Sequence, residues 1–146
     1  MEEAKELELA KELDKLLTSL KEKRVAQLIH KKYPNLRNIN ILWYPEGYLR
    51  NIYKRSVKPD IWWTLKDYKE NPNNYIELQF NEGYSKNNQI LHIGDEVVYD
   101  DRGCIFKGVV HHFTKDSLII NPDMDKYTRP ARVIGRYYIN KKVWKL

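Results

Sequence analysis

Hydrophobic positions recur at a helical spacing through the first part of the chain. Leucines three or four residues apart form one stripe, and Glu and Lys fill the positions between them. The stripe consists of Leu9, Leu13, Leu16, Leu17, Leu20, Val25, Leu28 and Ile29. This pattern predicts one amphipathic helix from Glu2 to about Lys32, acidic in its first turns and basic in its last. The apolar stripe is also a candidate homodimer contact.

After residue 32 the apolar runs become short, and Pro and Asn separate them. Ile39–Tyr44, Ile61–Leu65 and Tyr75–Phe80 are rich in β-branched and aromatic residues, which predicts three strands. We expect the last two runs to form an antiparallel hairpin, whereas Tyr48–Tyr53 fits either a short helix or a strand. Residues 81–88, which contain Gly, Ser and Asn, are the best candidate for a linker.

Residues 89–146 form a series of β-branched and aromatic runs bounded by turn residues, such as Asp101-Arg-Gly and Asn121-Pro-Asp. Four or five short antiparallel strands at this spacing predict a small barrel. The expected fold class is therefore α+β. It comprises a long N-terminal amphipathic helix (1–32), a mainly antiparallel β-rich middle region (33–88) and a small C-terminal β-barrel (89–146).

Four motifs in the last region suggest a family resemblance. They are Gly94-Asp-Glu-Val-Val-Tyr, Ile105-Phe-Lys-Gly-Val, Leu118-Ile-Ile-Asn-Pro-Asp and Val133-Ile-Gly-Arg. In this order they resemble the second half of the catalytic β-domain of LexA-type self-cleaving repressors and their signal-peptidase relatives, over about residues 90–140. The resemblance implies that Lys107 stands at the position of the general base. Ser56, in Ser56-Val-Lys-Pro-Asp, has a context similar to the family's Ser-Met-x-Pro and is the candidate nucleophile.

The same strands also fit an SH3-like or Tudor-like barrel. Its core would be Val97, Val109, Leu118, Ile120 and Val133, and its last two strands would be 132–136 and 137–140. Barrels of this kind bind nucleic acid or peptides through aromatic loops. The strand pattern alone does not distinguish between these two kinds of barrel.

Composition narrows the class of protein. Of the 146 residues 42% are hydrophobic and 32% charged, as in a globular protein. No apolar run is long enough to span a membrane, and no basic segment leads into an apolar one, so we expect a cytoplasmic protein without membrane contact. The single cysteine, Cys104, excludes an internal disulfide. The adjacent His111 and His112 are expected to point to opposite faces of a strand and not to share a metal ion.

The net charge of +6 is concentrated near the C-terminus. From Lys126 to Leu146 there are seven basic residues and no acidic one: Lys126, Arg129, Arg132, Arg136, Lys141, Lys142 and Lys145. This strip predicts a polyanion or an acidic protein surface as the partner. A second region interleaves aromatic rings with cations, the two ingredients of nucleic-acid backbone and base contacts. Its candidate binding residues are Arg50, Lys54, Arg55, Lys58, Trp62 and Trp63.

One carboxylate pair suggests metal chemistry. Pro59-Asp60 followed by Glu77-Leu-Gln79 is similar to the PD-(D/E)xK pattern of metal-dependent nucleases, with Gln79 in place of the lysine. In those enzymes two strand-borne carboxylates bind a divalent ion that activates water. Asp60 and Glu77 would then hold Mg²⁺, and no cofactor is expected otherwise.

These observations favour a small, basic, non-enzymatic binding protein that acts on nucleic acid or on a nucleic-acid-handling protein. Its Lys- and Asn-rich composition suggests a phage or mobile-element origin. A Ser–Lys self-cleaving or peptidase-like protein and a metal-dependent nuclease are the two alternatives.

Overall fold

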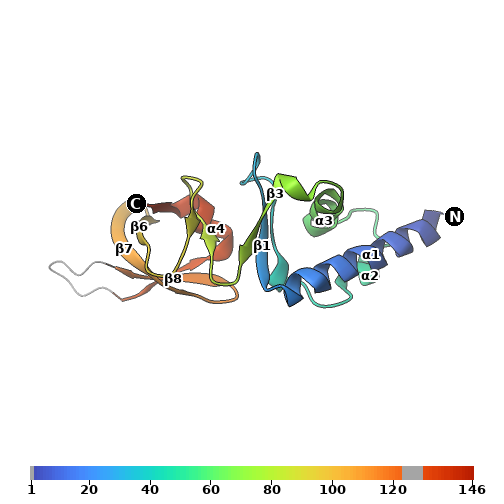
Figure 1. Cartoon of the computed structure of the whole chain (residues 1–146), viewed down its shortest axis with the longest axis horizontal. Coiled ribbons are helices and arrows are strands. Elements are labelled where there is room, and N and C mark those ends of the chain that lie inside the picture. The colour runs from blue at the N-terminus through green and yellow to red at the C-terminus, as the bar shows by residue number, and fades with distance from the viewer. Residues whose placement is uncertain (1, 123–129) are drawn as a thin grey trace. The chain divides into compact units, whose positions relative to one another are not determined.

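The chain consists of two compact units, Met1–Glu77 and Leu78–Leu146, each with its own hydrophobic core. The structure is a computed structural model that describes residues 2–122 and 130–146. Helices and mostly antiparallel sheets confirm the α+β class (Figure 1).

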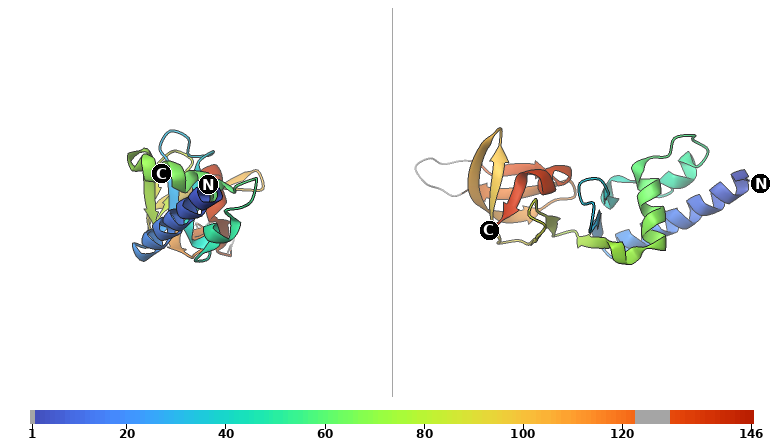
Figure 2. Two further views of the ribbon diagram at one scale, coloured as in Figure 1. Left: turned by 90° about the vertical axis from the view of Figure 1, so that its right-hand side faces the viewer. Right: turned by 90° about the horizontal axis from the view of Figure 1, so that it is seen from above.

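The first unit combines three helices with a small sheet. The helices are α1 (Glu2–Glu22), α2 (Tyr48–Ile52) and α3 (Asp60–Glu70). The strands β1 (Val25–His30), β2 (Asn38–Asn40) and β3 (Tyr75–Gln79) form a sheet in the order β2-β1-β3. Two 3-10 turns, η1 (Ile41–Trp43) and η2 (Pro72–Asn74), lie between these elements. Helix α1 contacts both α2 and α3, and the right-hand view of Figure 2 shows α3 crossing it.

The N-terminal helix is shorter than its periodicity predicts. It ends at Glu22, and Arg24 takes a left-handed conformation (φ 62°) that redirects the chain into β1. Strand β1 is buried along most of its length and pairs antiparallel with β2, with Leu28 opposite Ile39. The apolar stripe of α1 packs within its own unit, where Leu13 and Leu17 are fully buried. Most of the apolar stripe that the predicted homodimer would use is therefore buried within this unit, while Leu9 and Leu16 are partly exposed.

The predicted hairpin of Ile61–Leu65 with Tyr75–Phe80 is wrong, because Ile61–Leu65 is helical. Helix α3 starts after Pro59, whose carbonyl accepts a hydrogen bond from the amide of Trp62 (2.9 Å). Ile61, Leu65 and Tyr68 bury one face of this helix at the i, i+4 and i+7 positions. Strand β3 lies beside β1 instead. Tyr48–Ile52 is helical. Of the predicted strand Ile39–Tyr44, only residues 39 and 40 lie in β2, and Ile41–Trp43 forms η1.

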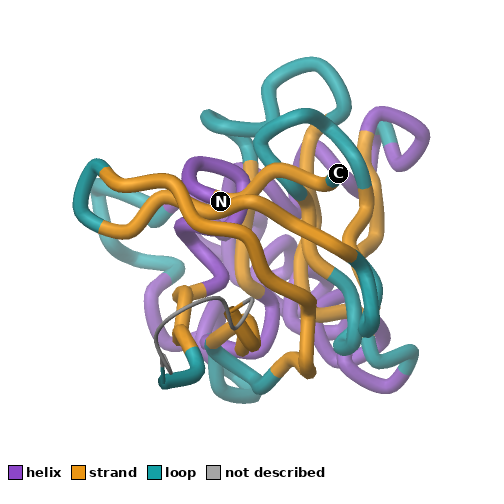
Figure 3. The backbone as a smooth tube through the Cα atoms, turned by 90° about the vertical axis from the view of Figure 1, so that its left-hand side faces the viewer, coloured by secondary structure: helices purple, strands orange, loops and turns teal. Residues whose placement is uncertain are grey.

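The second unit is a five-stranded antiparallel sheet with one short helix. Its strands are β6 (Glu96–Asp101), β7 (Cys104–Phe113), β8 (Ser117–Pro122), β9 (Arg132–Gly135) and β10 (Val143–Lys145), and α4 (Arg136–Lys142) joins the last two. The strand order is β10-β6-β7-β8-β9, because β10 returns to pair with β6. The five strands form a barrel-like sheet that does not close. Figure 3 draws the strands of the chain in orange.

Residues 81–88, the predicted linker, are part of this second unit. They contain β4 (Gly83–Tyr84), which pairs with β5 (Ile90–Leu91). Ser85 is fully buried, and its hydroxyl accepts a hydrogen bond from the amide of Gln89 (2.9 Å). The segment is therefore structured, and the predicted middle region 33–88 is divided between the two units.

The barrel core is close to the predicted one but not identical. Val97, Leu118 and Ile120 are buried as predicted, whereas Val133 is 54% exposed and Ile134 takes the inward position. Residues 137–140, predicted as a strand, lie in α4. In β7 a register shift between Val110 and His112 inserts an additional residue. Such a bulge changes the side to which the following side chains point.

Candidate functional site

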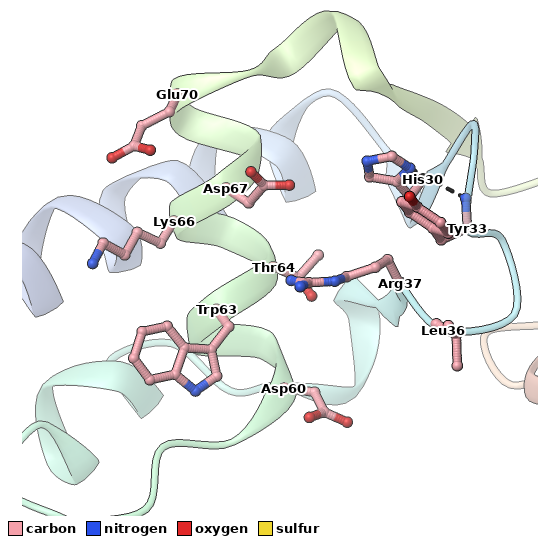
Figure 4. Close-up of a pocket in the computed structure, with 10 residues that line it drawn as sticks. All are labelled: His30, Tyr33, Leu36, Arg37, Asp60, Trp63, Thr64, Lys66, Asp67 and Glu70. Atoms are coloured by element: carbon pink, nitrogen blue, oxygen red, sulfur yellow. Dashed lines mark hydrogen bonds between the residues drawn. The ribbon is translucent and has the colours of Figure 1, made fainter.

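The first unit contains a pocket of about 470 Å³ between α3 and the loop that follows β1 (Figure 4). Its lining residues are His30, Tyr33, Leu36, Arg37, Asp60, Trp63, Thr64, Lys66, Asp67 and Glu70. The volume lies in the range of small-molecule sites. Among these residues, the sequence singled out only Asp60 and Trp63.

One wall of the pocket is a polar stripe of α3. Asp60, Thr64 and Asp67 lie at the i, i+4 and i+7 positions of the helix, and Figure 4 shows Arg37 reaching toward them from the opposite loop. The Tyr75 hydroxyl donates a hydrogen bond to Asp67 Oδ2 (2.6 Å), which lowers the pKa of Asp67. Arg37 lowers this pKa further. Asp67 is therefore a fixed anion at neutral pH.

The opposite wall contains His30, whose ring orientation is set by the backbone. Its Nδ1 accepts hydrogen bonds from the amides of Lys32 (3.1 Å) and Tyr33 (3.3 Å). A neutral His30 ring therefore carries its proton on Nε2, which Figure 4 shows on the side of α3. The Tyr75 ring meets the His30 ring edge to face, with centroids 5.0 Å apart. The pocket combines aromatic rings with charges of both signs, which suits a small polar ligand better than a polyanion.

The predicted metal pair does not have the geometry that the nuclease pattern requires. Asp60 opens a helix rather than a strand, and its side chain is exposed. Glu77 is exposed on β3, where its carboxylate accepts a hydrogen bond from the Tyr68 hydroxyl. Within residues 2–122 and 130–146, no group of three His, Cys, Asp or Glu side chains is placed to hold a metal ion. The strand-borne carboxylate site is therefore not formed by these two residues.

The predicted Ser–Lys dyad also lacks its physical basis. A lysine becomes a general base when burial disfavours its charged form. Lys107 is exposed on β7, and Ser56 is exposed in the segment between α2 and α3. The two residues belong to different units.

Most of the predicted aromatic and basic residues near α2 have structural partners. Arg50 pairs with Asp14 (3.1 Å), Lys54 with Glu3 (2.9 Å) and Lys58 with Glu6 (3.6 Å). These ion pairs connect α2 and the segment after it to α1. Trp62 is only 2% exposed and belongs to the core. Arg55 and Trp63 remain exposed, and Lys66 Nζ lies 5.5 Å from the centroid of the Trp63 ring.

The described residues of the C-terminal basic strip differ in whether they are engaged within the second unit. Arg129 lies outside the described residues. Arg132 pairs with Asp101 (3.2 Å) across the sheet, and Lys145 pairs with Asp95 (3.4 Å). Arg136, predicted as a binding residue, is 1% exposed, which corrects that prediction.

The guanidinium of Arg136 joins three segments of the second unit. Its Nε donates hydrogen bonds to the carbonyls of Thr114 (3.1 Å) and Lys115 (3.0 Å), and Nη1 donates one to the backbone carbonyl of Glu82 (3.0 Å). Nη2 donates to the carbonyl of Phe80. Burial lowers the pKa of Arg136 to about 10, so the side chain is still a cation at pH 7. Arg136 therefore stabilises the barrel rather than contacting a partner.

Lys141 and Lys142, the two remaining described residues of the strip, lie on α4 and are partly exposed. Tyr137 is 43% exposed and Tyr138 is 48% exposed, and their rings are perpendicular with centroids 5.1 Å apart. Lys141 Nζ lies 3.6 Å from the Tyr137 centroid, and Lys142 Nζ lies 5.2 Å from that of Tyr138. Among the described residues neither lysine has a carboxylate partner. These four side chains are called the α4 surface.

Comparisons with protein-family models, with curated proteins and with solved structures found no match. No helix in the described part of the chain is long and apolar enough to cross a membrane.

Proposed function

We propose that the protein is non-enzymatic and that it binds nucleic acid through the α4 surface of its second unit. The observation that carries this proposal is the pairing of two half-exposed tyrosine rings with Lys141 and Lys142. Aromatic faces stack on bases, and lysines without carboxylate partners neutralise phosphates. The other basic residues of the strip that the structure describes, Arg132, Arg136 and Lys145, are already engaged within the unit.

The second unit forms a barrel-like sheet that does not close, with the strand order β10-β6-β7-β8-β9. This arrangement is compatible with both the SH3-like and the LexA-like resemblance. Because such folds serve many functions, the proposal depends on the α4 surface and not on the fold.

Charge also favours an anionic partner for this unit. Residues 78–146 contain 11 Lys or Arg and 8 Asp or Glu, a net charge of +3. A positive field accelerates encounters with polyanions, and this effect weakens with salt.

The test measures the binding of labelled single-stranded DNA, duplex DNA and single-stranded RNA by fluorescence anisotropy at several salt concentrations. The double variant Lys141→Gln/Lys142→Gln is expected to bind more weakly. For a single strand, the plot of log K against log salt concentration should become less steep by about 1.4 in this variant, since each phosphate contact contributes about 0.7 to the slope. Tyr138→Ala is expected to lose about 1–3 kcal/mol of binding free energy if one base stacks on that ring.

Lys107→Gln/Lys115→Gln is the matched control, because it removes two charges from exposed positions elsewhere in the same unit. An equal loss in this control would mean that net charge, and not the α4 surface, determines binding. If the protein bound none of these nucleic acids at low salt but did bind an acidic protein, the partner would be an acidic protein surface and not nucleic acid.

A further inference from the structure

His111 and His112 meet on the exposed side of β7. Their Nδ1 atoms are 2.6 Å apart and their ring centroids 4.8 Å apart, and both side chains are exposed. Adjacent residues of a regular strand point to opposite faces. Here the register shifts between Val110 and His112. His112 is paired with Ile119 of β8, and His111 is the additional residue of the bulge. The sequence-based expectation that the two rings diverge is therefore wrong.

We propose that this histidine pair binds one divalent transition-metal ion through its two Nδ1 atoms, with Cu²⁺ preferred. Imidazole nitrogen is a common ligand of copper, nickel and zinc. In the metal-free pair, the Nδ1–H group of one ring donates a hydrogen bond to Nδ1 of the other. In the metal-bound pair both rings are neutral and carry their protons on Nε2, which leaves both Nδ1 lone pairs for the ion. The site is independent of the function proposed for the α4 surface.

The spacing of the two nitrogens favours one coordination geometry. At metal–nitrogen distances of about 2.0–2.1 Å, two ligands lie about 2.9 Å apart at a right angle and about 3.3 Å apart at a tetrahedral angle. From 2.6 Å the rings have to separate by about 0.3 Å for the first geometry and by about 0.7 Å for the second. Square-planar or tetragonal sites with right angles are typical of Cu²⁺, whereas Zn²⁺ prefers tetrahedral sites.

The number and type of ligands that the protein supplies determine how tightly each metal ion is expected to bind. No third His, Cys, Asp or Glu joins the pair among the described residues, so water or a small anion completes the coordination. The order of divalent-metal affinities also places Cu²⁺ above Ni²⁺ and Zn²⁺. We therefore expect a two-nitrogen site that binds Cu²⁺ at least ten-fold more tightly than Zn²⁺.

The test uses the whole chain without a polyhistidine tag and titrates it with Cu²⁺, Ni²⁺ or Zn²⁺ in a calorimeter. One Cu²⁺ per chain is expected, with an electron paramagnetic resonance spectrum that shows two imidazole nitrogens. His111→Asn and His112→Asn should each weaken Cu²⁺ binding at least ten-fold. His92→Asn is the matched control, because His92 pairs with Glu82 (2.9 Å) in the same unit, and it should leave the affinity unchanged. Circular dichroism checks that all three variants are folded.

A linear peptide of residues 108–116 tests whether the bulge or the His-His sequence alone determines the affinity for Cu²⁺. It contains both histidines but lacks β8, with which the bulge forms. It should bind Cu²⁺ at least ten-fold more weakly than the folded chain. Equal affinity for peptide and protein would overturn the proposal, as would a loss in His92→Asn as large as that in His111→Asn. A spectrum with fewer than two imidazole nitrogens would overturn it as well.

Discussion

At the scale of single residues, the buried Arg136 donates hydrogen bonds to four backbone carbonyls of the second unit. A guanidinium has five N–H donors in a rigid plane, so one arginine can bond several carbonyls at once. Here the carbonyls belong to two segments that are far apart in the chain, one with Phe80 and Glu82 and the other with Thr114 and Lys115. Removing the donor leaves buried acceptors without partners, which costs more than the hydrogen bonds themselves contribute.

Arg136→Lys is therefore expected to destabilise the second unit by about 2–4 kcal/mol, because a lysine cannot reach all of these carbonyls in one geometry. Urea unfolding, followed through the amide NMR signals of the second unit, measures the change. Arg102→Lys in the exposed β6–β7 turn makes the same chemical substitution and should stay within about 0.5 kcal/mol of the unmodified protein. Similar values for both variants would contradict the role of Arg136.

Tyr75 is predicted to determine how the first unit responds to acid. Its hydroxyl holds the pKa of Asp67 below the ordinary value of 3.8, so the hydrogen bond contributes stability above that pH. The contribution is lost as pH falls through the lowered pKa of folded Asp67. Tyr75→Phe should cost about 1–2 kcal/mol at pH 7 and progressively less as the pH falls below about 4.

The pKa of Asp67, measured by carbon NMR of its carboxyl group, should rise in Tyr75→Phe. Tyr68→Phe is the matched control, since the hydroxyl of Tyr68 bonds Glu77 instead and burial, together with Glu77, raises the pKa of Tyr68 to about 12. An unchanged Asp67 pKa in Tyr75→Phe would contradict the assignment.

At the scale of elements, the pairing of β7 with β8 depends on the absence of a side chain at residue 108. A Cβ there would lie 2.6 Å from both Asn121 O and Ile120 Cγ2, which is closer than such atoms can approach. Gly108→Ala should therefore destabilise the second unit by about 1–3 kcal/mol. In Gly135→Ala the nearest atom, Tyr138 Cδ2, lies at 3.5 Å, and the effect should be neutral or slightly stabilising. Thermal unfolding of the two variants checks this difference.

Pattern alone predicted the elements of this chain unevenly. The barrel strands are evident from the sequence because turn residues bound each run; Arg102 and Gly103, for example, separate β6 from β7 as the Asp101-Arg-Gly motif predicts. The helix was extended too far because Val25, Leu28 and Ile29 happen to continue its period, while the left-handed Arg24 that ends it has no sequence signal. Ile61, Leu65 and Tyr68 did carry a helical signal, which the aromatic, β-prone composition of the run obscured.

The candidate sites were harder to predict than the elements. Arg136 and Lys141 have equally polar surroundings in the sequence, and only the fold separates the fully buried Arg136 from the partly exposed Lys141. The pocket of the first unit brings together His30, Arg37 and Asp67 from separate elements. The bulge that unites His111 and His112 depends on the partner strand, so neither residue type nor spacing reveals it.

At the scale of the whole molecule, the two cores predict that the second unit folds when expressed alone. A fragment of residues 80–146 retains every carbonyl that Arg136 bonds, whereas 83–146 retains β4 but loses those of Phe80 and Glu82. The first fragment should show a cooperative thermal transition. The second should be less stable by about 1–3 kcal/mol, the cost of those two bonds. Equal stabilities would contradict this prediction.

The return of β10 to β6 has a consequence during synthesis. Chains emerge from the ribosome N-terminus first, and the sheet of the first unit is complete once β3 has appeared. The second unit has to wait longer, because Tyr99 of β6 pairs with Val143, 44 residues later (143 − 99). Until then β6 is an edge strand with unpaired amide and carbonyl groups, the kind of edge that nascent chains and chaperones recognise. The interval before β10 emerges is therefore when this protein is most exposed to aggregation.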